Sequence, residues 1–192
     1  PDAKYDFIFI GNIHNEERMR VKGFTIFLNA ISNIIKEHNY NPKIIILGKY
    51  SEEDIKFLVP GINELNMDFK GYINNKESIR KFLNQSKIFI LSSLSEGMPN
   101  SLMEAMANGT PSISTKVGGV EYLITNYKNG LLVEKGNSIK LSKSMWRLLN
   151  NEDLQKKISI NAKKSMKKFT WKKNYTKVLK IYKYVINKKK AH

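Results

Sequence analysis

Residues 88–109 read IFILSSLSEGMPNSLMEAMANG and contain a complete strand–loop–helix unit. The four apolar residues at its start, 88–91, predict a buried strand. The loop that follows leads into a predicted helix from Asn100 to Asn108, which Gly109 ends at the C′ position. A short apolar strand followed directly by a helix is typical of a parallel sheet that helices cover on both faces.

The same alternation extends in both directions along the chain. Five further apolar runs predict strands at 7–10, 43–48, 67–71, 112–114 and 131–133. Helices are predicted at 23–38, 51–58, 78–85, 120–124, 138–150, 152–168 and 171–188. Strands that alternate with helices, joined by right-handed crossovers, predict an α/β fold with a Rossmann-like, doubly wound sheet of about six parallel strands.

Composition narrows the class of protein. With 192 residues, 41% hydrophobic and 26% charged, the chain has the composition of one globular domain or a tight pair. No apolar run approaches the ~18 residues of a membrane span. The first residues do not resemble a signal peptide, so we expect a cytoplasmic protein. The absence of cysteine excludes disulfides and thiolate catalysis.

The net charge of +16 is concentrated at the C-terminal end. Residues 1–138 carry a net charge of +1, and residues 139–192 carry +15. We therefore divide the chain into a domain over 1–150 and basic C-terminal helices over 151–192 that pack on the same domain. The lysines of this segment cluster as Lys163-Lys164, Lys167-Lys168, Lys172-Lys173 and Lys188-Lys189-Lys190.

These lysines form either a solvated helical face or a surface attracted to an anionic membrane. The second interpretation places the protein at the inner face of the cytoplasmic membrane as a peripheral protein. The charge also suggests nucleic acid, but the sequence has no helix-turn-helix, zinc or RNA-binding aromatic motif. We therefore expect no nucleic-acid partner.

The loop after the strand at 88–91 combines features of a ligand site. The N-terminus of the next helix favours an anion such as a phosphate, and Gly97 allows the backbone to approach a ligand closely. Glu96 and Glu104 lie eight residues apart and are placed to contact different parts of one extended polar ligand. The alternative for Glu104 is structural, because Ser101 and Glu104 have the spacing of a capping box.

A longer string resembles the C-terminal half of family 4 glycosyltransferases, which are retaining enzymes of the two-domain GT-B fold. It runs from Ser92 to Val133 and includes SEGMPNSLMEAMANGTP at 95–111, TKVGGVE at 115–121 and NGLLV at 129–133. The flanks resemble the family more loosely, as in Phe9-Ile10-Gly11 followed by Lys22-Gly23-Phe24.

The resemblance implies roles for individual residues. Glu96 matches the glutamate that contacts hydroxyls of the donor sugar, and Glu104 matches the one that holds the ribose. Lys22 matches the basic residue that neutralises the diphosphate. The resemblance implies backbone contacts to sugar and diphosphate for Gly97, Met98, Pro99, Asn100 and Ser101. It implies contacts to the base for Gly71, Tyr72 and Ile73. Gly118 and Gly119 match a glycine pair at the donor cleft. Plain turn geometry is the alternative for the glycine pair.

One position departs from the family pattern. Asn12 stands where the family usually has an arginine, and Lys22 follows after a longer stretch than usual. A missing guanidinium would weaken stabilisation of the leaving group. Our hypothesis is that Arg18 or Arg20 replaces it, with Arg20 preferred because it is nearer to Lys22. The alternative is that both arginines are solvated.

The resemblance implies the donor half of a hexosyltransferase-type enzyme. Its donor is a nucleoside-diphosphate sugar, UDP-type favoured and GDP-type as the alternative, and its acceptor is a glycan or a lipid-linked glycan. No metal or other cofactor is expected, since there is no Asp-x-Asp motif. The N-terminal acceptor domain is expected to be absent from this chain, which alone would then be inactive. A non-catalytic nucleotide-sugar binding module is the alternative. No Gly-x-Gly-x-x-Gly follows the first strand, which disfavours a Rossmann dehydrogenase.

Overall fold

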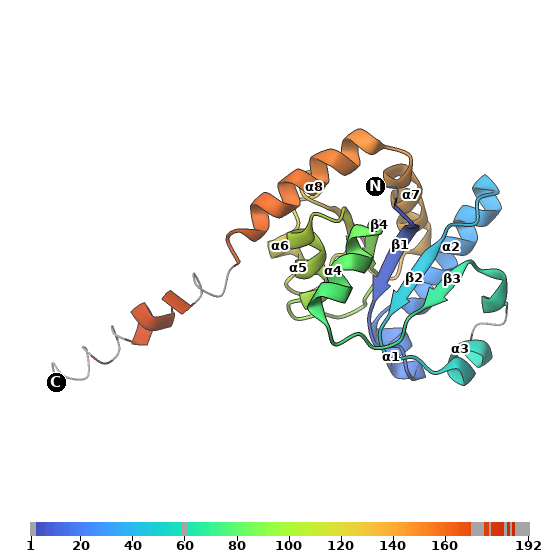
Figure 1. The fold of residues 1–192 in the computed structure, drawn as a ribbon, viewed down its shortest axis with the longest axis horizontal. Coiled ribbons are helices and arrows are strands. Elements are labelled where there is room, and N and C mark those ends of the chain that lie inside the picture. The colour runs from blue at the N-terminus through green and yellow to red at the C-terminus, as the bar shows by residue number, and fades with distance from the viewer. Residues whose placement is uncertain are drawn as a thin grey trace.

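Six parallel strands form one sheet at the centre of the computed structural model (Figure 1). They are β1 (Tyr5–Ile10), β2 (Ile44–Leu47), β3 (Met67–Phe69), β4 (Ser86–Leu91), β5 (Ser112–Thr115) and β6 (Leu131–Val133). Their order in the sheet is β3-β2-β1-β4-β5-β6, and every pair is parallel. This is the doubly wound order that the sequence predicts, and it confirms the fold class.

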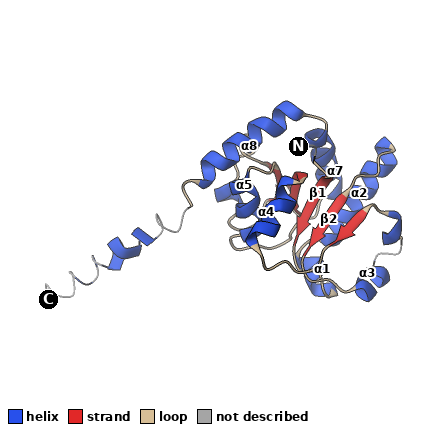
Figure 2. Ribbon diagram, in the orientation of Figure 1, coloured by secondary structure: helices blue, strands red, loops and turns tan. Residues whose placement is uncertain are grey.

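Helices cover both faces of the sheet (Figure 2). They are α1 (Glu16–Val21), α2 (Phe24–His38), α3 (Glu52–Leu58), the 3-10 helix η1 (Ile62–Glu64), α4 (Lys76–Asn84), α5 (Asn100–Asn108), α6 (Val120–Leu123), α7 (Ser138–Leu149) and α8 (Glu152–Met166). The structure describes residues 3–58, 61–169, 175–176, 178–182, 184 and 186.

Alternation along the strands separates two hydrophobic layers. In β1, Phe7 and Phe9 face a core that α2 and α7 complete, whereas Ile8 faces a second core beneath α4, α5 and α6. The central strands are buried on both faces, which explains why they read as continuous apolar runs. Each large apolar side chain buried in this way contributes roughly 1.5–3 kcal/mol of transfer free energy.

Helix α8 belongs to the same packed unit. Its Ala162 and Met166 are buried in the second core. Asn161 donates a hydrogen bond from Nδ2 to the carbonyl of Lys128, 3.0 Å away, and Ser165 accepts one from Asn129. The predicted helix over 171–188 falls partly outside the described residues, and its described members between 175 and 186 are helical. Apolar side chains of this part are exposed: Tyr175, Val178, Leu179, Ile181, Tyr182, Tyr184 and Ile186.

The amino-terminal edge of the sheet is closed by a polar network around Asp6. Its buried carboxylate accepts hydrogen bonds from the Tyr40 hydroxyl (2.8 Å), the Lys43 backbone N–H (3.0 Å) and Lys87 Nζ (2.9 Å). Burial, together with the hydrogen bond to Asp6, raises the pKa of Tyr40 to about 12. These groups satisfy one another's hydrogen-bonding capacity, so the network stabilises the fold at this edge.

Two elements were missed by sequence reasoning. The stretch between Asn12 and Lys22, interpreted as a loop, contains α1. Its signal is local, because Asn15 caps the helix by accepting the Arg18 N–H (2.9 Å) and two glutamates fill its first turn. The 3-10 helix η1 was also not predicted. Helix α4 begins two residues earlier than predicted, since Asn75 caps it by accepting two backbone N–H groups.

Candidate functional site

The strand order reverses between β1 and β4, and doubly wound sheets bind ligands at the carboxyl ends of the strands beside this switch point. Lys22, which ends α1, and Glu96, from the loop after β4, meet there. Lys22 Nζ lies 2.8 Å from Glu96 Oε1, and the Ser93 hydroxyl donates to the same oxygen over 2.7 Å. The side chains of Lys22 and Glu96 are 23% and 12% exposed, so they form a largely desolvated pair at the carboxyl edge of the sheet.

Gly23 brings Lys22 to this position. Its φ of 63° lies in the left-handed region, and a Cβ on it would stand 1.9 Å from the Ser92 carbonyl oxygen. The Ser92 hydroxyl in turn donates to the Gly23 carbonyl oxygen (2.8 Å). Leu94 N–H donates to the carbonyl of Val21 over 2.8 Å. The turn between α1 and α2 is therefore fastened directly to the loop after β4.

The glycine pair after β5 packs against the backbone of the same loop. A Cβ on Gly118, whose φ is 48°, would stand 1.8 Å from the Glu96 carbonyl oxygen. Gly119 N–H donates to the carbonyl of Gly97 over 2.7 Å, and Met98 lies against Gly119. Both glycines are thus required by close approach of two chain segments, which goes beyond plain turn geometry.

Helix α5 begins beside Glu96 without a side-chain cap. Its N-cap is Pro99, and no side chain there accepts a backbone N–H. Asn100 and Ser101 therefore occupy the first two helical positions, where the backbone N–H groups favour an anion. The capping-box alternative is wrong, because Ser101 is not the N-cap residue.

Glu104 lies one turn further along α5 with an exposed side chain. It lines a groove of about 420 Å³ between α4 and α5, together with Lys76, Arg80 and Lys163. The groove places Glu104 near the start of α4, the helix that follows the loop after β3. The Glu104 carboxylate therefore faces a solvent-exposed groove beside the β3–α4 loop.

The loops after β1, β2 and β3 are joined by hydrogen bonds. Asn12 Oδ1 accepts the Lys49 N–H at 2.9 Å, and Gly48 N–H donates to the Gly71 carbonyl at 2.8 Å. The next residue, Tyr72, exposes 59% of its surface. Ile73 is partly buried and packs on the second core. Lys49 follows the β2 glycine directly, and it was not predicted as a site residue.

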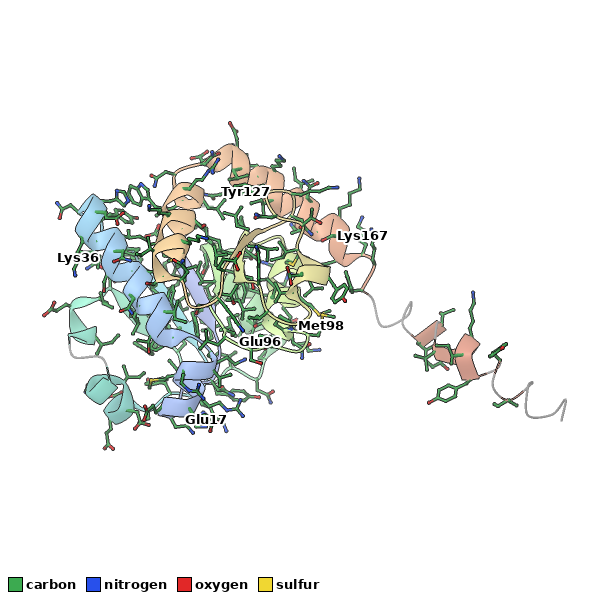
Figure 3. The ribbon with its side chains drawn as sticks, turned by 180° about the vertical axis from the view of Figure 1, so that it is seen from behind. Glu17, Lys36, Glu96, Met98, Tyr127 and Lys167 are labelled. Carbon is green, nitrogen blue, oxygen red and sulfur yellow. The ribbon has the colours of Figure 1, made fainter. Side chains whose placement is uncertain are left out.

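The arginines proposed to replace the residue at Asn12 lie on α1. Arg18 and Arg20 are both exposed, on either side of the buried Met19. Across the described part of the chain, neither side chain forms an ion pair within 4.0 Å. Figure 3 shows Glu17 of the same helix below Glu96 in the view. Lys22 at the end of the helix pairs with Glu96, so the helix borders the site, and an arginine role stays a hypothesis.

The described residues hold neither a metal-binding cluster nor a membrane-spanning helix. No group of three or more His, Asp or Glu side chains is arranged to hold a metal ion among residues 3–58, 61–169 and the described part of 175–186. Within the same residues, no helix is both long enough and apolar enough to cross a membrane.

The family model described as glycosyl transferases group 1 matches residues 4–151. The chain belongs to this family. A Campylobacter jejuni alpha-1,4-N-acetyl-D-galactosaminyltransferase, whose name specifies a GalNAc-containing diNAcBac-PP-undecaprenol substrate, is 30% identical over 165 residues. The match covers 84% of this chain and 43% of that protein.

Two solved structures share the fold, and the first is a glycosyl transferase group 1 family protein. The C-terminal domain of LpcC from Francisella tularensis superposes with a TM-score of 0.71 at 23% identity, covering 86% of each chain. HepE from Anabaena, solved in complex with UDP, gives a TM-score of 0.72 at 18% identity, covering 99% of this chain and 50% of HepE. The chain thus has the architecture of the C-terminal half of a GT-B enzyme, and it spans about half the length of the curated relatives it matches.

Proposed function

We propose that this domain binds the nucleoside-diphosphate sugar donor of a retaining glycosyltransferase, with Lys22 and Glu96 at the reacting end. The observation that carries the proposal is the 2.8 Å pair between these side chains at the β1–β4 switch point. An ammonium group and a carboxylate next to an uncapped helix N-terminus match the two halves of such a donor, a diphosphate and a polyhydroxyl ring.

Lys22 and the first N–H groups of α5 would hold the diphosphate. As the bond between the sugar C1 and the phosphate oxygen breaks, negative charge grows on the diphosphate. A fixed ammonium and fixed N–H groups stabilise that charge without reorganisation. In this proposal they take the place of a divalent cation.

Glu96 would orient the sugar and favour its positively charged transition state. The acceptor hydroxyl attacks C1 from the face that the diphosphate leaves, and its proton passes to a donor phosphate oxygen. The new C1–O bond therefore has the same configuration as the old one. Glu104 would hold the ribose hydroxyls, and the loop at Gly71, Tyr72 and Ile73 would contact the base.

A UDP-type donor and a lipid-linked glycan acceptor are the specific form of the proposal. UDP is bound in HepE, which shares this fold, and the C. jejuni relative is named for an undecaprenol-linked substrate. The acceptor would be bound mainly by a second, N-terminal GT-B half. The N-terminal half would have a contact surface in exposed apolar residues at helical spacing, which are Tyr175, Val178, Leu179, Tyr182 and Ile186.

Isothermal titration calorimetry of the 192-residue chain tests donor binding. We expect heat of binding with UDP and UDP-sugars, weaker binding of GDP-sugars, and no sugar transfer by this chain alone. A panel with no response to any nucleotide sugar would contradict the proposal. Donor binding without transfer, even when an N-terminal half is supplied, would indicate the non-catalytic module. Salt-dependent DNA binding in its place would indicate the nucleic-acid alternative.

We also propose that exposed lysines near the end of α8 attract the protein to an anionic membrane surface. Lys167 lies where α8 leads into the C-terminal segment, as Figure 3 shows, and Lys164 and Lys168 are exposed beside it. At about 1 kcal/mol per lysine, replacing these three by glutamine should lower partitioning onto phosphatidylglycerol vesicles roughly 100-fold. Vesicle co-sedimentation measures this effect.

The matched control for the vesicle experiment changes the same charge elsewhere. Lys36, Lys81 and Lys135 are also exposed but lie on α2, α4 and after β6. Glutamine at these three positions should leave vesicle binding near the wild-type level. Equal losses in both triple variants would mean that net charge alone acts, and unchanged binding in the α8 variant would remove the membrane role.

A further inference from the structure

Several lysines lie at the carboxyl edge of the sheet, and three of them have an acidic partner. Lys22, at the end of α1, pairs with Glu96. Lys70, after β3, pairs with Asp68, and Lys116, after β5, pairs with Glu134. The hydrogen bond and the charge of Glu134 raise the pKa of Lys116. Lys49, directly after β2, differs from them, since none of the described residues places a carboxylate within 4.0 Å of its ammonium group.

The backbone of Lys49 is nevertheless tightly fixed. Its N–H donates to Asn12 Oδ1 over 2.9 Å, and its carbonyl accepts the Ile13 N–H over 2.7 Å. The preceding Gly48 has a φ of 136°, and a Cβ there would stand 2.1 Å from the Gly11 carbonyl oxygen. The loop after β2 is thereby held against the loop after β1, and the Lys49 side chain starts from a defined point between the β1 and β3 loops.

The Lys49 ammonium rests on an aromatic ring. Its Nζ lies 5.7 Å from the centroid of the Tyr72 ring, which belongs to the loop proposed to contact the base. A cation on an exposed ring is a weaker contact than a charge-assisted hydrogen bond to a phosphate oxygen. An exposed ring face is also a platform on which a nucleobase stacks.

We propose that Lys49 is a second phosphate-binding cation of the donor site, held on Tyr72 until a nucleotide arrives. The proposal rests on the proposed function. A base that stacks on Tyr72 displaces the ammonium from the ring, and the lysine then reaches toward the diphosphate that its nucleoside carries. Asn12 takes part by fixing the Lys49 backbone, which gives that side chain a positioning role. The positive charge thus comes from the β2 loop, in contrast to the arginines of α1.

Comparing a nucleoside with its diphosphate tests this exchange. Titrations use uridine and UDP with the wild-type chain and with Lys49→Met, Lys49→Arg and Lys116→Met. We expect Lys49→Met to weaken UDP binding roughly tenfold or more, because a charged hydrogen bond is lost. Uridine binding should stay equal or become tighter, since the ring is no longer covered. Lys49→Arg should keep most of the UDP affinity, and Lys116→Met should match the wild type.

Each other outcome decides against the proposal. Unchanged UDP affinity in Lys49→Met would show that the lysine only covers Tyr72. Equal losses for uridine and UDP would show that it acts on the base or on the loop, and thermal unfolding of the variant would separate these two causes. If the wild-type chain binds UDP and Lys49→Met binds it equally tightly, this inference fails alone. If the wild type binds neither UDP nor GDP, the proposed function fails with it.

Discussion

Lys22→Met is expected to weaken UDP binding about 10- to 150-fold, the effect of losing a hydrogen bond to a charged group worth about 1.5–3 kcal/mol. The methionine keeps the length and most of the volume of the lysine stem, so the change removes the charge. Calorimetric titration with UDP and with a UDP-sugar measures the effect. Wild-type affinity in this variant would place the diphosphate away from the β1–β4 switch point.

Glu96→Gln is the control for the same pair, and it should have the opposite sign for UDP. Glu96 pairs with Lys22 over 2.8 Å, so it would compete with a phosphate for that ammonium. The amide would release Lys22, and we expect UDP to bind at least as well as in the wild type. A UDP-sugar should lose affinity relative to UDP, because an amide would replace the carboxylate proposed to accept the sugar hydroxyls.

Gly23→Ala is expected to lower the free energy of unfolding by about 2–5 kcal/mol, combining left-handed strain with overpacking. The added Cβ would stand 1.9 Å from the Ser92 carbonyl oxygen, and Gly23 holds a φ of 63°. Relief requires the α1–α2 turn to move off the loop after β4, so Lys22 would also leave Glu96. Urea unfolding followed by circular dichroism gives the stability change.

Gly136→Ala isolates the conformational part of that effect. Gly136 has a φ of 79°, but no atom lies within 4 Å of the position of its added Cβ. We expect a loss of about 1–2 kcal/mol from left-handed strain alone. If both variants lose the same stability, close approach between the turn and the β4 loop is not what makes Gly23 necessary.

The sheet was predictable from the sequence because its strands are buried on both faces. Runs such as 44–47 and 88–91 contain only apolar residues, so they indicate buried strands without knowledge of the neighbouring elements. The loop at 92–99 was predictable for a related reason, since a glycine and two carboxylates at fixed spacing follow a strand. Neither prediction depends on contacts between distant parts of the chain.

Other features depend on contacts that sequence spacing does not contain. Asn12 turns its side chain to a backbone N–H of the next loop, 37 positions away, and only the fold brings Lys49 there. The stretch before Lys22 was interpreted as a longer loop because α1 has only six residues and one buried side chain. Glycine is needed at 118 because the Glu96 carbonyl oxygen, in the loop after β4, lies close to the Gly118 backbone in the loop after β5.

The pairing of Lys22 with Glu96 has a consequence for the end of a reaction cycle at such a site. Two charges that satisfy each other leave less unbalanced potential to hold a bare nucleotide. In the proposed function, a bound sugar would occupy Glu96 and keep that carboxylate away from Lys22. After transfer, Glu96 would pair with Lys22 again and weaken the hold of that lysine on the nucleoside diphosphate. The same ion pair would therefore favour the nucleotide sugar over the product nucleotide.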